Sequence, residues 1–380
     1  MRPKWLIVVA LIAAATIFVV WANKRMTEQD TGLEMCVSGS GPVSIPDDLR
    51  QRELVWCTNA NVPLKIEWGG EGYDLFQLIG VPESVRPFSW SVGRRPIRDE
   101  WNVASVGIGS GAGVGHDRYW TEDLGGFINP RVSADWSFIV STRQVGGSQD
   151  VVRITTRDGG MQVVSFHHSI DRWPSISRDG RKVLFHSFRD VNPAGDLYLA
   201  VQREFPDGEW ETHRLTDNAT QEYILPMMDS DASHCIAVER KIGDEVGRII
   251  LWSIVDWKLE NPLYLTADPG QVKHPSLSAN AEKCCWQEMV KGKWSVIVWD
   301  ASTQARNVIG PSVPPYAGYG WVQPAISPDG RFVTFVDDLK EAGADRIGIY
   351  DLRDGSVIYL QGCGGNIMFP SLTDKLEYAS

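Results

Sequence analysis

The stretch Pro324-Ala325-Ile326-Ser327-Pro328-Asp329-Gly330 decides the fold of this chain, because related copies of it recur at nearly constant spacing. The other copies begin at Pro130 (PRVSADWSFIV), Pro174 (PSISRDGRKVLF), Pro226 (PMMDSDASHCIA), Pro275 (PSLSANAEKCCW) and Pro370 (PSLTDKLEYAS). The intervals between successive prolines are 44, 52, 49, 49 and 46 residues. A period in the forties filled with strand-like sequence is typical of a propeller or an array of small sheets.

The copies also agree in chemistry when they are aligned on the proline. The second residue after it is apolar in all six, and the third carries a hydroxyl in every copy except one, which has Asp229. The fifth is Asp or Asn in all but the last copy, and Gly180 and Gly330 follow it in two of them. Asp, Asn and Gly at these places predict a turn. The apolar residues beyond the turn alternate with period two, which indicates a strand.

Each repeat contains two more strand-like runs, separated by turn residues such as Asp354-Gly355. The third strand is expected at 197–201, 249–254, 296–299 and 347–350, and the fourth at 163–166, 213–216, 263–266 and 357–360. Four short strands in a unit of this length predict a β-propeller blade in an all-β fold. A linear solenoid is the alternative, but it would need polar caps at both ends. We expect ring closure instead, with residues 370–380 completing a blade that the N-terminal segment begins.

The number of blades is less directly determined than their structure. Residues 53–58, 64–68 and 73–79 also have strand-like sequence, and a faint copy of the motif begins at Pro87. Roughly 340 residues divided by a repeat of about 48 predicts seven blades. Six blades with an additional N-terminal module are the alternative. The propeller is expected to span residues 46–380.

The PxxSxDG turn followed by an apolar strand resembles the TolB-type propeller repeat of bacterial exported proteins. The resemblance extends over residues 130–380 and implies a β-propeller. It leaves the function open, because such propellers occur as binding scaffolds, as lyase-like enzymes and as the lid of prolyl-oligopeptidase-type hydrolases. The region before Pro130 has no amphipathic helix pattern, unlike TolB with its small α/β domain. We therefore do not expect this chain to be TolB itself.

Composition excludes one class of partner. The formal net charge is −11, and the 380 residues contain no run of Lys and Arg. A chain of this kind is poorly suited to binding phosphate backbones, so nucleic acid is not an expected partner. The 16 Trp residues could fill the core or offer surfaces for sugar rings. Trp252, Trp286 and Trp299 fall inside strands and are expected in the core.

The N-terminus predicts a membrane anchor and an exported propeller. Residues 5–22 carry no charge and would span about 27 Å as a helix, close to the thickness of a bilayer core. Trp5 and Trp21 stand at the two edges, where aromatic belts lie. We expect a signal anchor over residues 1–22 and a tether over 23–45, with the propeller on the extracytoplasmic side. A cleavable signal is the alternative, and it would make the protein secreted.

The cysteines and histidines give no metal or cofactor motif. Cys235 and Cys284 occupy the same apolar slot in two repeats, with Cys285 adjacent, so buried thiols are expected. Cys36 and Cys57 could pair in an oxidising compartment, but sequence cannot show whether they are close enough. The adjacent pair His167-His168 would point to opposite sides of a strand and chelate poorly. No metal and no cofactor is therefore predicted.

The candidate site is the mouth of the propeller. The first strand of each blade lines the axis, so residues next to the repeated proline should surround one opening, and they differ between repeats in a way that suits ligand binding. The predicted ligand-binding residues are Arg131, Arg172, Trp173, Lys273, His274, Trp321 and Gln323. Their cations favour an acidic or carboxylated ligand. No nucleophile has a recognisable setting, so no catalytic residue is predicted.

These observations predict a membrane-anchored, exported propeller that binds a protein or another cell-envelope ligand, including glycan, without catalysis. A carbohydrate-active, lyase-like enzyme acting on acidic polysaccharide is an alternative, because Trp is abundant and the mouth carries cations. An assembly scaffold in an envelope complex is another. It predicts an exposed apolar patch on the propeller.

Overall fold

The structure is a computed structural model in which residues 34–37, 52–58, 62–63, 67–68, 90–91, 94–95, 102–107, 117–119 and 126–374 are described. The last range has gaps at 136, 146–147, 158, 166, 192, 205–207, 311–319, 339–345 and 362–366. The chain divides into two units, one of residues 1–32 with 60–98 and the other of residues 33–59 with 99–380. The described elements are strands apart from one 3-10 turn at Arg189–Val191.

The second unit consists of antiparallel sheets with four strands each. Three sheets use consecutive strands: β9 (Gly126–Val132), β10 (Phe138–Val145), β11 (Ser148–Thr155) and β12 (Met161–Val163); β13 (Asp171–Ile176), β14 (Lys182–Ser187), β15 (Asp196–Gln202) and β16 (Trp210–Arg214); β17 (Gln221–Met228), β18 (His234–Lys241), β19 (Arg248–Val255) and β20 (Lys258–Tyr264). Two more follow the same order: β21 (Val272–Leu277), β22 (Lys283–Val290), β23 (Lys293–Asp300) and β24 (Ala305–Ile309); β25 (Gly320–Ile326), β26 (Phe332–Asp338), β27 (Arg346–Asp351) and β28 (Val357–Gln361). A single parallel bridge between Trp294 and Gly320 links the last two.

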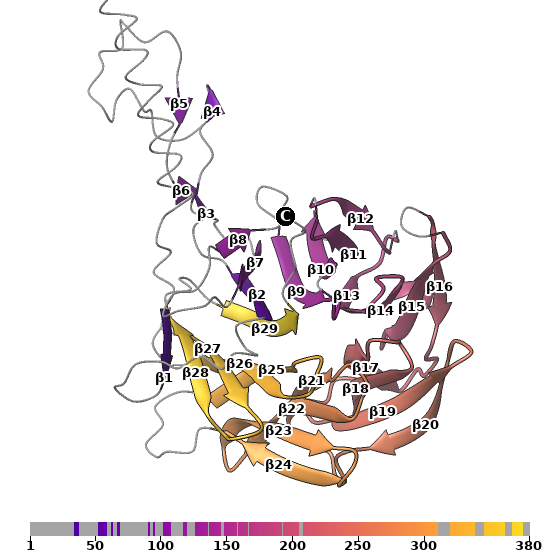
Figure 1. The fold of residues 1–380 in the computed structure, drawn as a ribbon. Coiled ribbons are helices and arrows are strands. Elements are labelled where there is room, and N and C mark those ends of the chain that lie inside the picture. The colour runs from indigo at the N-terminus through magenta and orange to yellow at the C-terminus, as the bar shows by residue number, and fades with distance from the viewer. Residues whose placement is uncertain are drawn as a thin grey trace, which may run out of the picture. The chain divides into compact units, whose positions relative to one another are not determined.

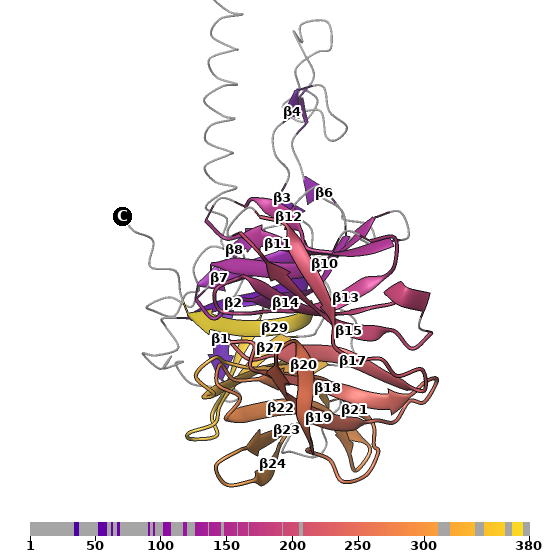
Figure 2. The ribbon, with the colours of Figure 1, turned by 90° about the vertical axis from the view of Figure 1, so that its right-hand side faces the viewer.

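The sixth sheet joins the two ends of this unit. Strand β29 (Ile367–Asp374) pairs with β2 (Arg52–Thr58), and β7 (Asn102–Gly107) and β8 (Asp117–Tyr119) complete the sheet. Leu372 lies opposite Leu54 in this pairing. Figures 1 and 2 show the yellow β29 beside the indigo β2 from two directions. The expected closure of the ring by the C-terminal strand is confirmed.

The innermost strands settle the number of blades. Strands β9, β13, β17, β21, β25 and β29 contact one another in that order, and β29 contacts β9. The ring is therefore closed by six blades, and the prediction of seven is wrong. The all-β propeller with four-stranded blades is confirmed, and the alternative of six blades is the correct count. The error came from residues 60–98, whose sequence is strand-like. Dividing the length of the chain by the length of the repeat cannot distinguish a blade from an inserted segment.

Residues 60–98, which lie in the sequence between β2 and β7, belong to the other unit. Its described residues form two short pairs, β3 (Val62–Pro63) with β6 (Arg94–Arg95) and β4 (Glu67–Trp68) with β5 (Trp90–Ser91). In the propeller unit, β1 (Glu34–Val37) adds a fifth strand to the outer edge of the β25–β28 blade by pairing with β28. Part of the segment expected to be a tether, residues 23–45, is thus a strand of the propeller sheet.

The repeated Ser and Asp residues form the turn between the first two strands of a blade. In the blade that begins with β25, Ser327 Oγ donates to Asp329 Oδ1 (2.6 Å) and accepts the Phe332 N–H (2.9 Å). Equivalent Ser–Asp or Ser–Asn bonds occur at Ser133, Ser177 and Ser278. The predicted turn chemistry is confirmed, because the side chains satisfy main-chain groups that the turn would otherwise leave unpaired.

Main-chain hydrogen bonds join these turns around the axis. The N–H of Arg178 donates to the carbonyl of Ser230 (2.8 Å), Ser230 to Ala279 (3.0 Å) and Ala279 to Pro328 (2.8 Å). All four residues stand at the same place in the repeat, four residues after its proline. We call this end of the innermost strands the turn end. Neighbouring blades are fixed there by groups that do not depend on side-chain identity.

Apolar side chains fill the spaces between blades. Trp286 is fully buried in a cluster that joins the β17–β20 and β21–β24 blades, and Trp252 and Trp299 are buried as expected. Cys235, Cys284 and Cys285 are buried free thiols, which confirms that prediction. Burial raises the pKa of all three. Thiols held neutral in this way are poor nucleophiles.

The third strands lie where they were expected, whereas the fourth strands begin and end earlier in three blades. The prediction placed one at residues 263–266, but β20 runs from Lys258 to Tyr264. Thr266 instead accepts the N–H of Ile249 with its side chain. A fourth strand lies at the exposed edge of its blade, so apolar residues do not mark its whole length. In these three blades the apolar residues that predicted it lie at or just beyond its C-terminal end, and the predicted range was therefore too late in the sequence.

Several expectations concern residues outside the described part of the chain. Residues 5–22, expected as an anchor, lie outside it, and the described residues contain no helix long and apolar enough to cross a membrane. Cys36 and Cys57 lie in described strands, but their side chains are not described, so their pairing stays open.

Candidate binding mouth

A β-bulge interrupts every innermost strand at the repeated proline. In the β13–β14 pair the register passes from Arg172 opposite His186 to Ser175 opposite Leu184, so Trp173 and Pro174 together face Phe185. The same two-against-one arrangement occurs in the other five blades. A bulge leaves a residue out of the ladder and turns its side chain in a new direction. The sequence gives no sign of the bulge except the proline, which cannot donate to the ladder.

The residue before the proline has a left-handed backbone in five of these bulges. The φ angles lie between 49° and 55° for this set: Asn129, Trp173, Leu225, His274 and Gln323. Left-handed backbone costs about 1–2 kcal/mol for a residue with a Cβ atom, and Gly would avoid the cost. Strained residues of this kind gather at functional sites. We call the region around these five residues the mouth.

Two small cavities follow each other along the axis. Asn129, Trp173, Leu225 and His274 line a cavity of about 10 Å³ at the mouth. The second cavity, of about 70 Å³, is lined by the first and second residues after each repeated proline, up to Leu372. Both are lined by Arg131 and Met227, which are in contact: Arg131 Nε lies 3.1 Å from Met227 Sδ.

The size of these cavities decides what they can hold. Sites for small organic ligands occupy about 300–1,000 Å³, whereas one water needs about 10–15 Å³. The axial cavities, at about 10 and 70 Å³, therefore suit water. Any larger ligand of this mouth must bind on its outer surface.

Burial keeps two of the predicted site residues away from their usual titration range. Burial lowers the pKa of Arg131 to about 10, and the nearby Cys285 opposes this shift weakly. Burial, followed by the charges of Arg131 and Lys273, lowers the pKa of His274 to about 3. His274 is therefore a neutral imidazole at neutral pH, which can donate one hydrogen bond and accept another but adds no charge to the mouth.

A cluster of aromatic and charged side chains surrounds Arg172. Its guanidinium lies 3.9 Å from the ring centre of Trp173 and 4.9 Å from that of Phe188. The ring of His186 lies behind these two, 5.3 Å from Trp173 and 4.9 Å from Phe188. Glu222 of the next blade is 3.9 Å from Arg172 and is itself bonded to Arg240.

The structure brings some predicted residues together and separates others. Trp173, His274 and Arg131 line one cavity, and Arg172 stacks on Trp173. Arg131, however, lines both axial cavities and does not lie on the rim of the mouth.

The other predicted residues are spread over two neighbouring blades. Lys273 is exposed near the Trp294 ring (5.4 Å), and the Gln323 N–H donates to Gln287 of the preceding blade. Trp321 is not available to a ligand: it is 4% exposed and stacks on Phe335 at 3.9 Å. Its place in the site was a wrong prediction, because its side chain points into the blade core.

Sequence reasoning missed the residues that come to the mouth from second strands and neighbouring blades. His186 and Phe188 follow the turn of their own repeat, and Glu222 and Arg240 belong to the next one. The pairing of Arg172 with His186 across β13 and β14 could have been found only from the strand register. Met227 follows its repeated proline directly, as Arg131 does, so alignment of the repeats already placed Met227 next to the axis.

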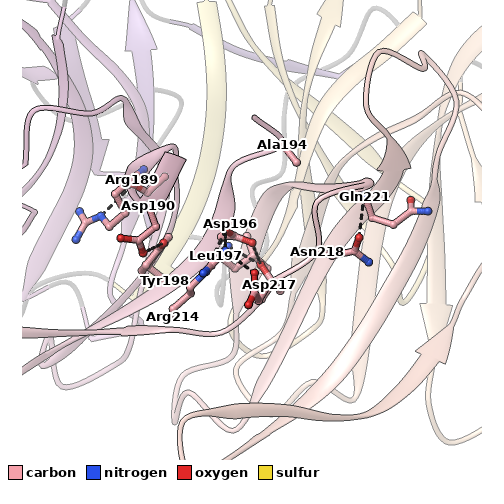
Figure 3. A network of polar contacts seen from close by, with 12 residues as sticks. Arg189, Asp190, Ala194, Asp196, Leu197, Tyr198, Arg214, Asp217, Asn218 and Gln221 are labelled. Atoms are coloured by element: carbon pink, nitrogen blue, oxygen red, sulfur yellow. Dashed lines mark hydrogen bonds and ion pairs between the residues drawn. The ribbon is translucent and has the colours of Figure 1, made fainter. Parts of the chain in front are cut away.

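Other arginines of the β13–β16 blade have carboxylate partners. Arg214 bonds Asp196 (2.6 Å) and Asp217 (2.7 Å), as Figure 3 shows. Arg189 bonds Asp171 (2.8 Å), and Tyr198 next to it donates to Asp190. These pairs tie the strands and the loops of the blade together and leave the arginines few free donors.

Elsewhere in the described residues, no group of three His, Cys, Asp or Glu side chains could hold a metal ion. Large apolar side chains that are exposed concentrate on the β17–β20 blade. These are Ile242, Val246, Val255, Trp257, Leu263 and Tyr264. They lie on its outer strands and on the hairpins that join its strands.

Solved structures with a similar fold support a TolB-like propeller. TolB from Acinetobacter baumannii matches with a TM-score of 0.57 and 15% identity, over 87% of this chain and 68% of that chain. A putative TolB from Agrobacterium tumefaciens gives 0.50 and 18%, over 68% and 94%. A chain of a nidogen/laminin complex gives 0.53 and 10%, over 85% and 98%. At these identities the similarity concerns the fold alone.

No family model matches the sequence, and no curated protein matches it. The structural similarity agrees with the resemblance of the repeats to the TolB type. The function of the propeller therefore has to be inferred from its own residues.

Proposed function

We propose that this chain is a binding scaffold whose mouth recognises another macromolecule of the cell envelope, without catalysis. One observation carries the proposal: five blades hold five different side chains in the same strained, left-handed conformation around one opening. Glycine would adopt the left-handed conformation at each of these positions without strain. Side chains retained at this cost suggest that their chemistry is used, and their variety suits one specific surface.

The small axial cavities support recognition on the surface rather than inside a pocket. With about 70 Å³ in the larger cavity, the axis has room for water but not for an organic ligand, so a partner would meet the side chains of the mouth from outside. A propeller similar in fold occurs in a complex of nidogen and laminin. We extend this to a protein partner for the present chain.

The proposal includes export and attachment to a membrane. Residues 5–22 form an uncharged apolar run with Trp at both edges, and basic residues precede and follow it. Such a segment fits a signal anchor, with the propeller on the extracytoplasmic side. Cleavage of this segment would make the same scaffold a secreted one. Mass spectrometry of the mature N-terminus distinguishes the two.

Site-specific photo-crosslinking tests the binding function. Lys273 and Asn280 suit the purpose, because both are exposed and they lie at opposite ends of β21, at the mouth and at the turn end. A benzophenone amino acid at position 273 of the full chain should give a discrete adduct with an envelope protein, and the same group at position 280 should not. No adduct at 273, or the same adduct from both positions, would contradict the proposal.

The lyase alternative has less support at this mouth. A catalytic base works best with a pKa near the working pH, and the pKa of His274 is lowered to about 3. The alternative stays a prediction that product formation on uronate polymers can test. Its loss in Arg172→Ala and His274→Ala variants would restore a catalytic role for the mouth.

A further inference from the structure

Arg172 is held in a fixed orientation by two aromatic rings. Its guanidinium lies over the rings of Trp173 (3.9 Å) and Phe188 (4.9 Å), and 26% of its side chain is exposed. Stacking of this kind attracts the guanidinium to the ring faces and restricts its motion. The charged group is therefore pre-oriented at the surface of the mouth.

The N–H donors of Arg172 are unused among the described residues. Its Nε is buried without a hydrogen-bond acceptor, and its nearest carboxylate, Glu222, is 3.9 Å away. Glu222 is bonded to Arg240 at 2.8 Å, so its own charge is already shared. Arg189 and Arg214 of the same blade, in contrast, each donate to carboxylates at 2.6–2.8 Å. Figure 3 shows the carboxylate partners of Arg214.

A second polar atom lies unused behind the same rings. His186 is fully buried, and its Nδ1 has no partner, while its Nε2 lies 3.3 Å from the carbonyl of Ala194. Buried polar atoms without partners are rare and each calls for an explanation. Here two of them, on Arg172 and His186, occur opposite each other in one strand pair.

Building on the proposed function, we propose that Arg172 binds a carboxylate of the partner, and that the partner presents it on an acidic peptide segment. A planar guanidinium binds a carboxylate through two parallel hydrogen bonds. Glu222, 3.9 Å away, disfavours the second charge of a phosphate. Arg172 already lies over the Trp173 ring and His186 packs against that ring at a tilt of 52°, so the ring is less open to a sugar than a free one would be.

Binding of labelled peptides to the full chain tests this site. The probes are a fluorescein-labelled peptide of alternating Glu and Gly with an amidated C-terminus, its Gln counterpart, a phosphoserine counterpart and a labelled oligouronate. The Glu peptide should bind at least about tenfold more tightly than the Gln peptide, as expected for hydrogen bonds to a charged group. Arg172→Lys should remove most of this difference, because Lys lacks the planar pair of donors.

The control for that variant is Arg331→Lys. Arg331 also stacks on a ring, that of Phe332 at 4.5 Å, but its donors are taken by Asp351. It should leave peptide binding unchanged. A second test does not depend on the fold surviving a change at Arg172: Glu222→Gln removes the competing charge and should tighten binding a few-fold. Glu239→Gln, in an equally buried pair with Arg248, should not.

The outcomes separate this inference from the proposed function. Equal binding of the Glu and Gln peptides, or an unchanged preference in Arg172→Lys, would overturn the carboxylate site. Tighter binding of the phosphoserine peptide or of the oligouronate would overturn the choice of ligand. If the adduct at position 273 persists in Arg172→Lys, the binding function stands and the subsite is wrong. If no adduct forms at all, the binding function itself fails.

Discussion

The two ends of the innermost strands are built on opposite rules. At the turn end, the blades repeat the same side chains, and Ser327 with Asp329 makes the same bonds as its counterparts in other blades. At the mouth, the blades repeat the backbone, a bulge with a left-handed residue, while the side chains differ. The difference teaches that uniform side chains maintain the turns at one end, whereas at the other end a uniform backbone carries varied side chains, which are the ones that the proposed recognition would use.

The largest effect is expected at the turn end. Gly180 has a φ of 69°, and a Cβ atom there would lie 2.3 Å from the ring of Phe138 in the preceding blade. Gly180→Ala should lower the free energy of unfolding by about 2–4 kcal/mol, because left-handed strain adds to a steric clash. Chemical denaturation measures the change. A loss below about 1 kcal/mol would show that this turn does not fix the blades against each other.

At the mouth, the free energy of unfolding should fall in acid, because His186 is buried as a neutral imidazole. Burial lowers the pKa of His186 from about 6.5 to about 3, with the charges of Arg172 and Arg240 contributing. The unfolded chain therefore takes up the proton first, and stability is lost as pH falls from about 6.5 towards 3. The loss is about 1.4 kcal/mol for each pH unit, or about 2 kcal/mol by pH 5.

His186→Gln tests this expectation, because glutamine stays neutral throughout the range. The stability of the variant should depend less on pH between 6.5 and 5 than that of the natural chain. His168→Gln, at an exposed position, is the matched control. The same pH dependence with and without His186 would show that the imidazole is not buried as a neutral group.

A smaller effect is expected for one hydroxyl of the turn end. Ser327→Ala removes the acceptor of the buried Phe332 N–H and the donor to Asp329, and should cost about 1–2 kcal/mol. Lys273→Ala, at the mouth end of a neighbouring blade, should change stability by less than about 0.5 kcal/mol. Thermal or chemical unfolding of both variants compares the two ends directly. Equal effects would remove the distinction between them.

The smallest effect should be a gain. Ala281 stands where Gly180 and Gly330 stand in other repeats, and its φ is 56°. Ala281→Gly should raise the free energy of unfolding by about 0.5–1 kcal/mol, because relief of left-handed strain exceeds the added entropy of the unfolded chain. Denaturant midpoints measure it. A destabilised variant would mean that the Ala281 methyl group, which is buried, packs more favourably than the strain costs.

Much of the fold follows from the sequence because the repeat is local. A proline, a hydroxyl and an acid within six residues specify a turn and its following strand, and their spacing specifies a blade. The blade count could not be obtained in this way. Residues 60–98 contain strand-like sequence but lie in a separate unit, and only the contacts among the innermost strands show where the ring closes.

The site was predictable only in part, for a related reason. Alignment on the proline located Trp173 and His274 at the mouth, since equivalent positions of equivalent blades surround one axis. It also included Trp321, one residue further from the proline than Arg172, whose side chain turns into the core. Both residues precede the bulge, so the ordinary period-two alternation of a strand places their side chains on opposite faces.

The amino-acid sequence by itself determined that this chain forms four-stranded blades around an axis and that their turns are held by Ser and Asp, because these features depend on residues close together in the chain. Only the tertiary structure decided that six blades close the ring, that five of the residues before the prolines share a left-handed backbone, and that Arg172 lies over two aromatic rings near Glu222. Those features arise from contacts between strands and blades that are distant in sequence. Their geometry is fixed when the ring closes, and local patterns cannot contain it.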